Sequence, residues 1–293
     1  MQTENYLVLD GCVLELRKQF MKLEADILPK FQRARGRLEL GFTSKKNLNC
    51  LSHLHQSGCL KALIPKNYSS VPDVVLINTS GGITGGDELG INVGLSPRAQ
   101  VRLTTQTAER VYKSNHGFGK IELKFDLKEE SALDWLPQET ILFDKSAIKR
   151  EITVRMLETS SLFMIESIIL GRDAMGERLT NNLFVDQWRI LREKRITYAE
   201  SLKLSNANEL SGFATLGQNK ALATLLYVAP NAEQKLERMR TLLKQHNLMS
   251  AASAWDGKLV ARLVTDCPQR LRETLISIIF KFRQKQVPRV WLI

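Results

Sequence analysis

The chain has 293 residues, of which 43% are hydrophobic, and its 42 Lys and Arg against 31 Asp and Glu give a formal net charge of +11. This composition excludes a fibrous or disordered chain and predicts a folded globular protein. No apolar run approaches the roughly 18 residues of a membrane span, because the best candidate, residues 162–170, contains Glu166.

The N-terminal residues predict a cytoplasmic protein. Glu4 stands where a signal peptide carries positive charge, and the apolar run that follows ends at Asp10. The four cysteines contain no C-x-x-C pair, so we expect reduced thiols. Residues 201–293 hold 14 basic against 6 acidic side chains, without the interleaved aromatics of an RNA-binding pattern. We therefore expect an acidic protein partner, and neither nucleic acid nor a membrane.

In chain order, residues 1–30 predict an N-terminal extension and residues 31–293 a single larger domain. From about Val74 to Val264 the apolar residues recur at period two or in short blocks between Gly, Pro, Asn and Asp, which predicts strands. The expected strands are residues 74–78, 89–95, 100–105, 120–127, 152–157, 162–170, 186–191, 221–228 and 259–264. Nine short strands predict a mainly β fold, which could be a sandwich, a barrel or a β-solenoid.

Two segments of the basic last third have helical spacing instead. The first, residues 231–247, has Asn231 as its expected N-cap. The second, residues 266–283, has Asp266 as its expected N-cap and Pro268 in its first turn. Its apolar residues share one face: Leu271, Leu275, Ile278 and Ile279.

A glycine cluster at residues 78–87 follows an apolar strand and could suggest a phosphate-binding loop. A P-loop ends in Gly-Lys-Ser/Thr, however, whereas Asp87 follows Gly86 here. We therefore interpret the glycines as turns or close backbone approaches. The G-x-S-x-G and H-E-x-x-H motifs of hydrolases are also missing from the sequence, so we do not expect an enzyme.

Two groups of side chains could bind a metal ion. Cys50, His53, His55 and Cys59 offer atoms suited to nickel, zinc or copper. Their spacing fits no standard zinc pattern, and a surface loop is the simpler interpretation. The second group consists of carboxylates, several within apolar runs: Asp87, Glu139, Asp144, Glu166, Asp173 and Glu177. Such a carboxylate pairs with Arg or lines a wet cavity if it is buried, and otherwise faces solvent.

Six blocks of the sequence, taken in order, resemble the UreD family of urease accessory proteins, called UreH in some bacteria. The longest reads Thr-Thr-Gln-Thr-Ala-Glu-Arg-Val-Tyr-Lys-Ser at residues 104–114. The others are residues 78–87, 135–140, 170–177, 254–259 and 288–291. The resemblance runs from about Arg35 to the last residue. It implies a largely β fold of helical-solenoid type with a few helices, which agrees with the nine expected strands and with the two helices expected in the C-terminal third.

The resemblance also implies a function. Proteins of this family bind urease apoprotein and UreF, which recruits the GTPase UreG, and the assembly delivers nickel to urease. The implied protein is a non-enzymatic scaffold with no tightly bound cofactor and with nickel in transit. Oxygen ligands release nickel more readily than a Cys/His cage, which favours the carboxylates as the path. The expected members are Asp87, Glu139 and Glu166, with Asp144 and Glu177 behind them and with Thr84 and Arg110 orienting them.

Two alternatives remain open in the sequence. A nickel-storage protein would use Cys50, His53, His55 and Cys59 instead of the carboxylates. The expected UreF surface is the basic C-terminal helical region, but its apolar stripe could equally pack on the protein's own sheet. The residues of this expected surface are the anchors Leu271, Leu275 and Ile279 and the rim residues Arg270, Arg272 and Lys281.

Overall fold

The structure is a computed structural model that describes residues 32–293 except 47, 67–68, 173–174, 178, 207–209, 211 and 213–214. Residues 34–293 form one compact unit. The predicted extension, residues 1–30, and Asp173 lie outside the described residues. No helix in the described part of the chain is long and apolar enough to cross a membrane.

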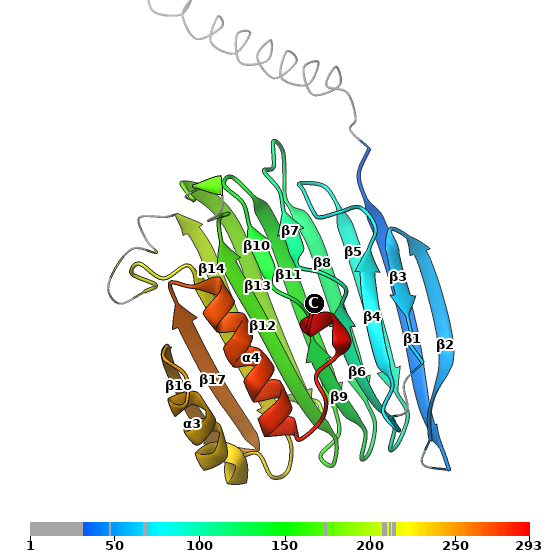
Figure 1. The fold of residues 1–293 in the computed structure, drawn as a ribbon. Coiled ribbons are helices and arrows are strands. Elements are labelled where there is room, and N and C mark those ends of the chain that lie inside the picture. The colour runs from blue at the N-terminus through cyan, green and yellow to red at the C-terminus, as the bar shows by residue number, and fades with distance from the viewer. Residues whose placement is uncertain are drawn as a thin grey trace, which may run out of the picture. The chain divides into compact units, whose positions relative to one another are not determined.

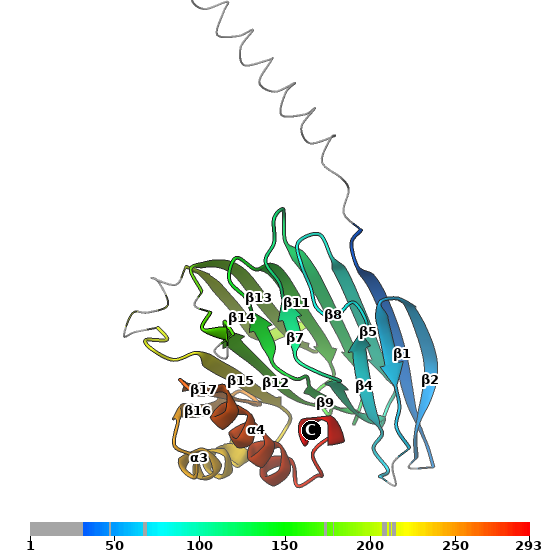
Figure 2. The ribbon, with the colours of Figure 1, turned by 45° about the horizontal axis from the view of Figure 1, so that its top comes forward.

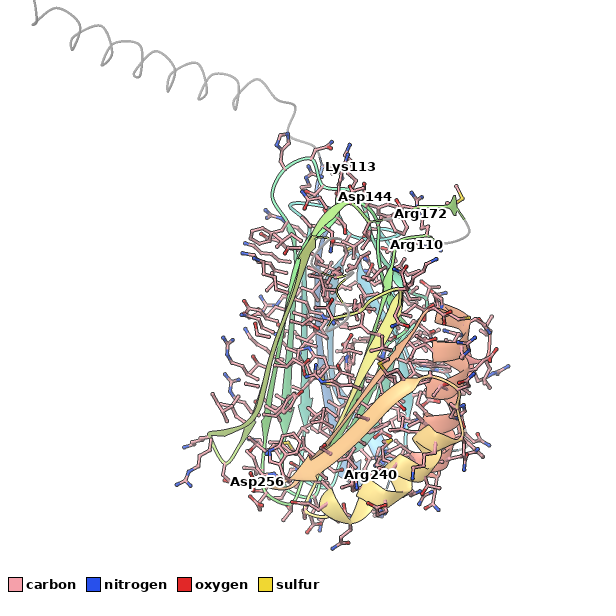
Figure 3. The ribbon with its side chains drawn as sticks, turned by 90° about the vertical axis from the view of Figure 1, so that its left-hand side faces the viewer. Arg110, Lys113, Asp144, Arg172, Arg240 and Asp256 are labelled. Carbon is pink, nitrogen blue, oxygen red and sulfur yellow. The ribbon has the colours of Figure 1, made fainter. Side chains whose placement is uncertain are left out.

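Two β-sheets make up most of this unit and lie face to face (Figures 1 and 3). The first has seven strands in the described residues, in the spatial order β14 (Arg195–Asn206), β13 (Asn181–Arg192), β11 (Ala147–Met156), β8 (Gly119–Leu127), β5 (Glu88–Leu95), β1 (Arg35–Lys45) and β2 (Leu48–Gly58). The second has the order β16 (Met249–Trp255), β17 (Lys258–Thr265), β15 (Ala221–Val228), β12 (Ser161–Leu170), β9 (Ala132–Leu136), β6 (Gln100–Thr105), β4 (Asp73–Asn78) and β3 (Leu60–Leu63). Two short strands, β7 (Glu109–Val111) and β10 (Thr140–Leu142), pair with each other, and β10 also pairs with β12.

The chain winds as a solenoid, in which each turn contributes one long strand to each of the two sheets. From β5 to β12 the long strands fall alternately in the first and the second sheet, and each pairs in parallel with the equivalent strand of the next turn. One turn takes roughly thirty residues. The predicted mainly β, solenoid-like arrangement is therefore confirmed.

Apolar and polar residues alternate along the strands, so that the apolar side chains fill the space between the sheets. In β11, Ile148, Ile152 and Val154 point inward and are buried, while Lys149 and Glu151 point outward. The register stacks inward residues of neighbouring strands into continuous apolar rows, such as Leu38, Ile91, Leu123, Ile152 and Trp188. Burial of these rows supplies the main driving force for folding.

Two α-helices lie on the outer face of the second sheet, near β15 and β17 (Figures 1 and 2). They are α3 (Leu236–Lys244), which follows the 3-10 helix η2 (Glu233–Lys235), and α4 (Pro268–Arg283). Their apolar faces form a second core with that sheet, in which Phe163, Tyr227 and Phe282 contact one another. The chain ends after a second 3-10 helix, η3 (Arg289–Trp291), whose Trp291 is buried in the same core.

All nine predicted strands and both predicted helices are present, although several ends differ by a few residues. The two predicted N-caps are wrong. Ala232 and Cys267 occupy the N-cap positions of η2 and α4, and neither makes a side-chain cap hydrogen bond. Asn231 instead accepts a hydrogen bond from Tyr227, and Asp266 pairs with an arginine of α4.

The sequence also missed several strands. The residues of β2 are exposed along nearly the whole strand, so apolar and polar residues do not alternate there. β7 and β10 have only three residues each, which is too short for a period to be recognised.

Candidate functional site

A cavity of about 120 Å³ lies between the two sheets, where the strand ends of the second sheet meet β7 and β10. Apolar residues of both sheets, among them Leu76, Ile91 and Leu123, form part of its wall. Its polar lining consists of Asn78, Thr105, Gln106, Thr107, Glu109, Arg110, Gln138, Thr140, Arg150 and Glu166. The cavity is therefore polar although both sheets around it are packed with apolar side chains.

Three charged residues occupy inward positions where the alternation of their strands calls for apolar side chains. Arg150 stands between Ile148 and Ile152 in β11, and Asp186 is its directly opposite residue in β13. Glu166 projects from β12 in the second sheet, across the space between the sheets. All three are buried.

These three residues form a paired cluster. Arg150 donates Nε and Nη2 to the two carboxylate oxygens of Asp186 at 2.8 and 2.6 Å, and Nη1 to Glu166 at 2.5 Å. Glu166 also accepts a hydrogen bond from Trp135 Nε1 at 2.7 Å. The sequence left open whether Glu166 pairs with Arg, lines a cavity or faces solvent, and the structure places it both in the pair and at the cavity wall.

The cluster has one positive charge for two carboxylates. Burial raises the pKa of Glu166 to about 7; the Arg150 charge opposes this shift and the Asp186 charge adds to it. An arginine keeps its charge at all physiological pH values. The cluster therefore changes net charge close to neutral pH through Glu166.

Glu109 is the second carboxylate that lines the cavity. It begins β7, and its two carboxylate oxygens accept hydrogen bonds from Asn78 Nδ2 at 3.2 and 3.3 Å. Burial raises the pKa of Glu109 to about 7; the Asn78 hydrogen bond opposes this shift and the Asp87 charge adds to it. No lysine or arginine of the described residues forms an ion pair with it. Arg110, the next residue, also lines the cavity and is exposed.

Asp87, a predicted path residue, is buried beside the glycine-rich loop. Its carboxylate accepts hydrogen bonds from the main-chain N–H groups of Ala34 and Thr84, both at 2.8 Å. Thr84 thus orients Asp87 as expected, but through its backbone. Gly82 in this loop has φ of 149° and no room for a Cβ beside Tyr112, which agrees with the interpretation of the glycines as close approaches.

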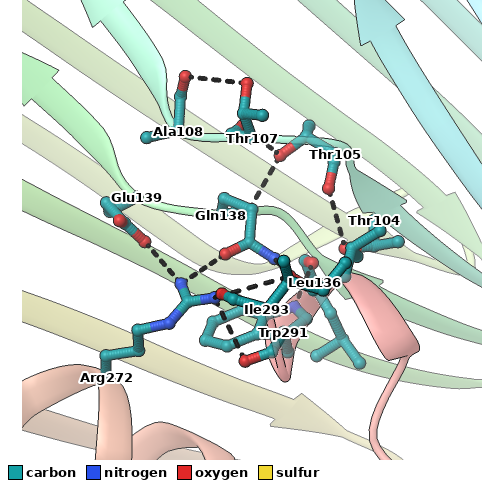
Figure 4. Close-up of polar contacts among 11 residues, drawn as sticks. Thr104, Thr105, Thr107, Ala108, Leu136, Gln138, Glu139, Arg272, Trp291 and Ile293 are labelled. Carbon is teal, nitrogen blue, oxygen red and sulfur yellow. Dashed lines mark hydrogen bonds and ion pairs between the residues drawn. The ribbon is translucent and has the colours of Figure 1, made fainter.

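Glu139 lies at the corner between β9 and β10, beside the C-terminus (Figure 4). Arg272 of α4 donates Nη1 to Glu139 at 3.1 Å and also to Gln138, which lines the cavity. The Nη2 atom of Arg272 donates to the main-chain oxygens of Val290, Trp291 and Ile293. One guanidinium therefore joins the cavity wall, Glu139 and the chain end.

Asp144 lies beyond β10, at the same end of the sheets as Arg110 and Arg172 (Figure 3), and Glu177 forms an ion pair with Arg172. Asp144 accepts hydrogen bonds from Thr180 and Asn181; burial opposes their effect, but together with Lys145 they lower its pKa. Hydrogen bonds from Arg172 lower the pKa of Glu177, which also accepts from the main chain of Asp144. Neither carboxylate lines the cavity.

Three residues of the alternative site lie in the exposed edge strand β2, whereas Cys59 follows the end of that strand and is partly buried against the core. His53 and His55 lie in β2, opposite Gly41 and Glu39 of β1, and Cys50 is exposed nearer the other end of the strand. Within the residues that the structure describes, no three or more His, Cys, Asp or Glu side chains are grouped to hold a metal ion. The described residues thus contain no such cage.

The apolar stripe of α4 packs on the protein's own sheet. Leu271, Leu275 and Ile279 are buried in the second core, so in this structure they are not accessible to a partner. That outcome is the alternative the sequence left open. Of the expected rim residues, Arg272 holds the C-terminus, Arg270 pairs with Asp266, and Lys281 is exposed.

Sequence reasoning missed Glu109, Arg150 and Asp186. The signal for the last two was available, because each interrupts an apolar alternation on the inward side of its strand. Glu109 gave no such signal, since β7 has three residues.

Two packed sheets wound as a solenoid, with a polar, carboxylate-bearing cavity between them, define a protein of the β-solenoid class. The family profile described as UreD urease accessory protein matches residues 34–292. A urease accessory protein UreD from Rhizobium leguminosarum bv. trifolii is 40% identical over 263 residues, which cover 89% of this chain and 96% of the relative. One from Dinoroseobacter shibae is 40% identical over 271 residues, 92% of this chain and 96% of the relative. The chain belongs to the UreD family of urease accessory proteins, which implies a role in urease maturation.

Proposed function

We propose that this chain is the scaffold through which nickel reaches urease, and that the cavity between its sheets is part of the path. The proposed partners are the urease apoprotein and UreF, with the GTPase UreG held through UreF. The proposed site of action is the cytoplasm, where the free thiols of Cys50, Cys59 and Cys267 stay reduced. The observation that carries the proposal is a polar cavity lined by one buried carboxylate, Glu166, and one partly buried carboxylate, Glu109, in a member of a family of urease accessory proteins.

Glu109 is the best placed first ligand for the ion. Its carboxylate is partly buried at the cavity and is held only by the neutral Asn78 amide among the described side chains. A divalent cation would remove the unfavourable burial of that charge, and oxygen ligands would still release nickel. Glu166 offers a second carboxylate along the same wall, but Arg150 and Trp135 already occupy its oxygens.

The remaining predicted carboxylates support this path from its surroundings. The charge of Asp87 acts on Glu109, and its hydrogen bonds hold the glycine-rich loop beside the cavity. Glu139 adjoins Gln138 at the cavity wall and is neutralised by Arg272. Asp144 and Glu177 hold the segment beyond β10 and would meet the ion only outside the cavity. No observation favours nickel storage at the cysteines and histidines.

The test is a Glu109→Gln variant supplied to cells that lack the native gene. Glutamine keeps the hydrogen bond from Asn78 and removes the charge that would bind nickel. We expect urease that assembles normally but carries less nickel per active site, with the accessory complex still formed. Glu122→Gln is the matched control, because Glu122 is exposed and, among the residues that the structure describes, forms an ion pair only with Lys124. Unchanged nickel content in the Glu109→Gln cells would remove Glu109 from the path.

A further inference from the structure

Strand β2 forms the edge of the first sheet at one end of the solenoid (Figures 1 and 2). Several of its apolar side chains are uncovered. Among the described strands β2 pairs only with β1, so no described strand pairs with the main-chain groups of its other edge. Leu51 and Leu54 are 38% and 43% exposed, and Leu48 and Leu63 nearby are more exposed still. Four of the large exposed hydrophobic side chains thus fall within sixteen residues of one another along the chain.

The exposed leucines continue the core of the protein. Leu51 is opposite Phe42 and Leu54 is opposite Leu40 in β1, and cross-strand partners share one face of a sheet. Phe42 and Leu40 are only 1% and 3% exposed. The apolar face between the sheets therefore extends onto β2, where the second sheet no longer covers it.

The second sheet holds β2 on both sides of these leucines. Asn49 donates to the main-chain oxygen of Ser70 and accepts from the N–H of Gln100. Gln56 accepts from the N–H of Ala62 in β3. Leu51 and Leu54 lie between these two attachments, so the strand is fixed in place while its apolar centre remains open.

The charge at this end is strongly positive. Within the described part of residues 35–66, Glu39 is the only acidic residue, and the basic ones are Arg35, Arg37, Lys45, Lys46, Lys61 and Lys66. Two copies of this end would repel each other, which disfavours self-association through β2. A partner with acidic side chains around an apolar contact would complement both properties.

We propose that an acidic segment of a partner protein docks on β2, places an apolar side chain against Leu51 and Leu54, and pairs with the open strand edge. Addition of a strand to an exposed edge is a common mode of peptide recognition. The lysines around the leucines would then speed association, and salt would weaken it. This docking surface is separate from α4 and from the cavity.

The experiment measures binding of purified urease apoprotein and of UreF to a Leu51→Asp/Leu54→Asp double variant of the full chain. The choice of these two probes rests on the proposed function. We expect at least a tenfold loss of affinity for one of them. The control is Ile196→Asp, because Ile196 is 63% exposed on β14 at the opposite edge of the same sheet, and it should bind both probes as the wild type does.

A second variant guards against misfolding of the first. Lys45→Glu/Lys46→Glu changes only exposed side chains at the β1–β2 turn and should weaken the same complex, most strongly at low salt. If the Leu51→Asp/Leu54→Asp and Lys45→Glu/Lys46→Glu variants both bind both probes with wild-type affinity, the docking proposal is wrong but the proposed partners still stand. Failure of the wild-type chain to bind either probe would overturn the proposed partners, and the docking proposal with them.

Discussion

The partly buried carboxylate of Glu109 should make the protein less stable as the pH rises. Its pKa in the folded protein is raised from 4.5 to about 7, with burial as the main cause. A folded pKa above the unfolded one means that the folded state holds its proton over that interval, so stability is present below about pH 4.5 and is lost as pH rises through 7. At about 1.4 kcal/mol for each pKa unit, the ionised group lowers the free energy of unfolding by about 3 kcal/mol.

Replacing Glu109 by glutamine should remove this loss. The free energy of unfolding, from urea titrations of the purified chain without nickel, should be close to wild type near pH 4.5. It should exceed wild type by up to about 3 kcal/mol at pH 8. The raised pKa of Glu166 affects both proteins equally and cancels in the comparison.

An exposed glutamate provides the control for this measurement. Glu122→Gln, on the exposed outer face, should follow the wild-type pH dependence. A difference between Glu109→Gln and wild type that stays constant with pH would show that Glu109 is not desolvated as described. If the variant is more stable and yet loads less nickel into urease, misfolding cannot explain the loss.

Two further substitutions test the contacts around the cavity. Arg150→Met should lower the free energy of unfolding by about 3–5 kcal/mol, because it leaves Glu166 and Asp186 buried without their cation. A loss below about 1 kcal/mol in urea unfolding would contradict the pairing. Arg272→Ala should cost about 1–3 kcal/mol and speed proteolysis of the C-terminus, because Glu139 and the last carbonyl groups lose a shared donor. An Arg272→Ala protein with wild-type proteolysis would show that the guanidinium does not hold the chain end.

Arg270→Ala provides the control for the C-terminal substitution. Arg270 lies on the same helix, but its ion pair with Asp266 is exposed and joins residues four apart. Such surface pairs contribute about 0.5 kcal/mol or less, so the variant should behave as the wild type does.

The period-two pattern predicted most of the long inner strands because burial on one face imposes it. β5, β8 and β11 place every second residue between the sheets, and their sequences show it. β2 was not predicted because neither of its faces is buried, so nothing selects an alternating sequence there. The parallel register and the way the turns stack come from contacts between distant residues, which single segments do not encode.

The candidate site was predicted in part for a similar reason. Glu166 stood out because it interrupts a long apolar strand, and it lies at the cavity. Asp87 and Asp144 were equally conspicuous in the sequence, but their carboxylates bind main-chain N–H groups of nearby loops. Whether a carboxylate faces a cavity or caps a loop depends on tertiary packing. The sequence alone therefore could not distinguish Glu166 from Asp87 and Asp144 as candidate site residues.

The most direct test of the central claim is the nickel content per active site of urease purified from cells with and without this gene, grown with the same nickel supply. The account predicts that urease from the deletion strain assembles normally but lacks nickel, and that the wild-type gene restores it. Equal nickel occupancy in the two strains would contradict a role of this chain in nickel delivery.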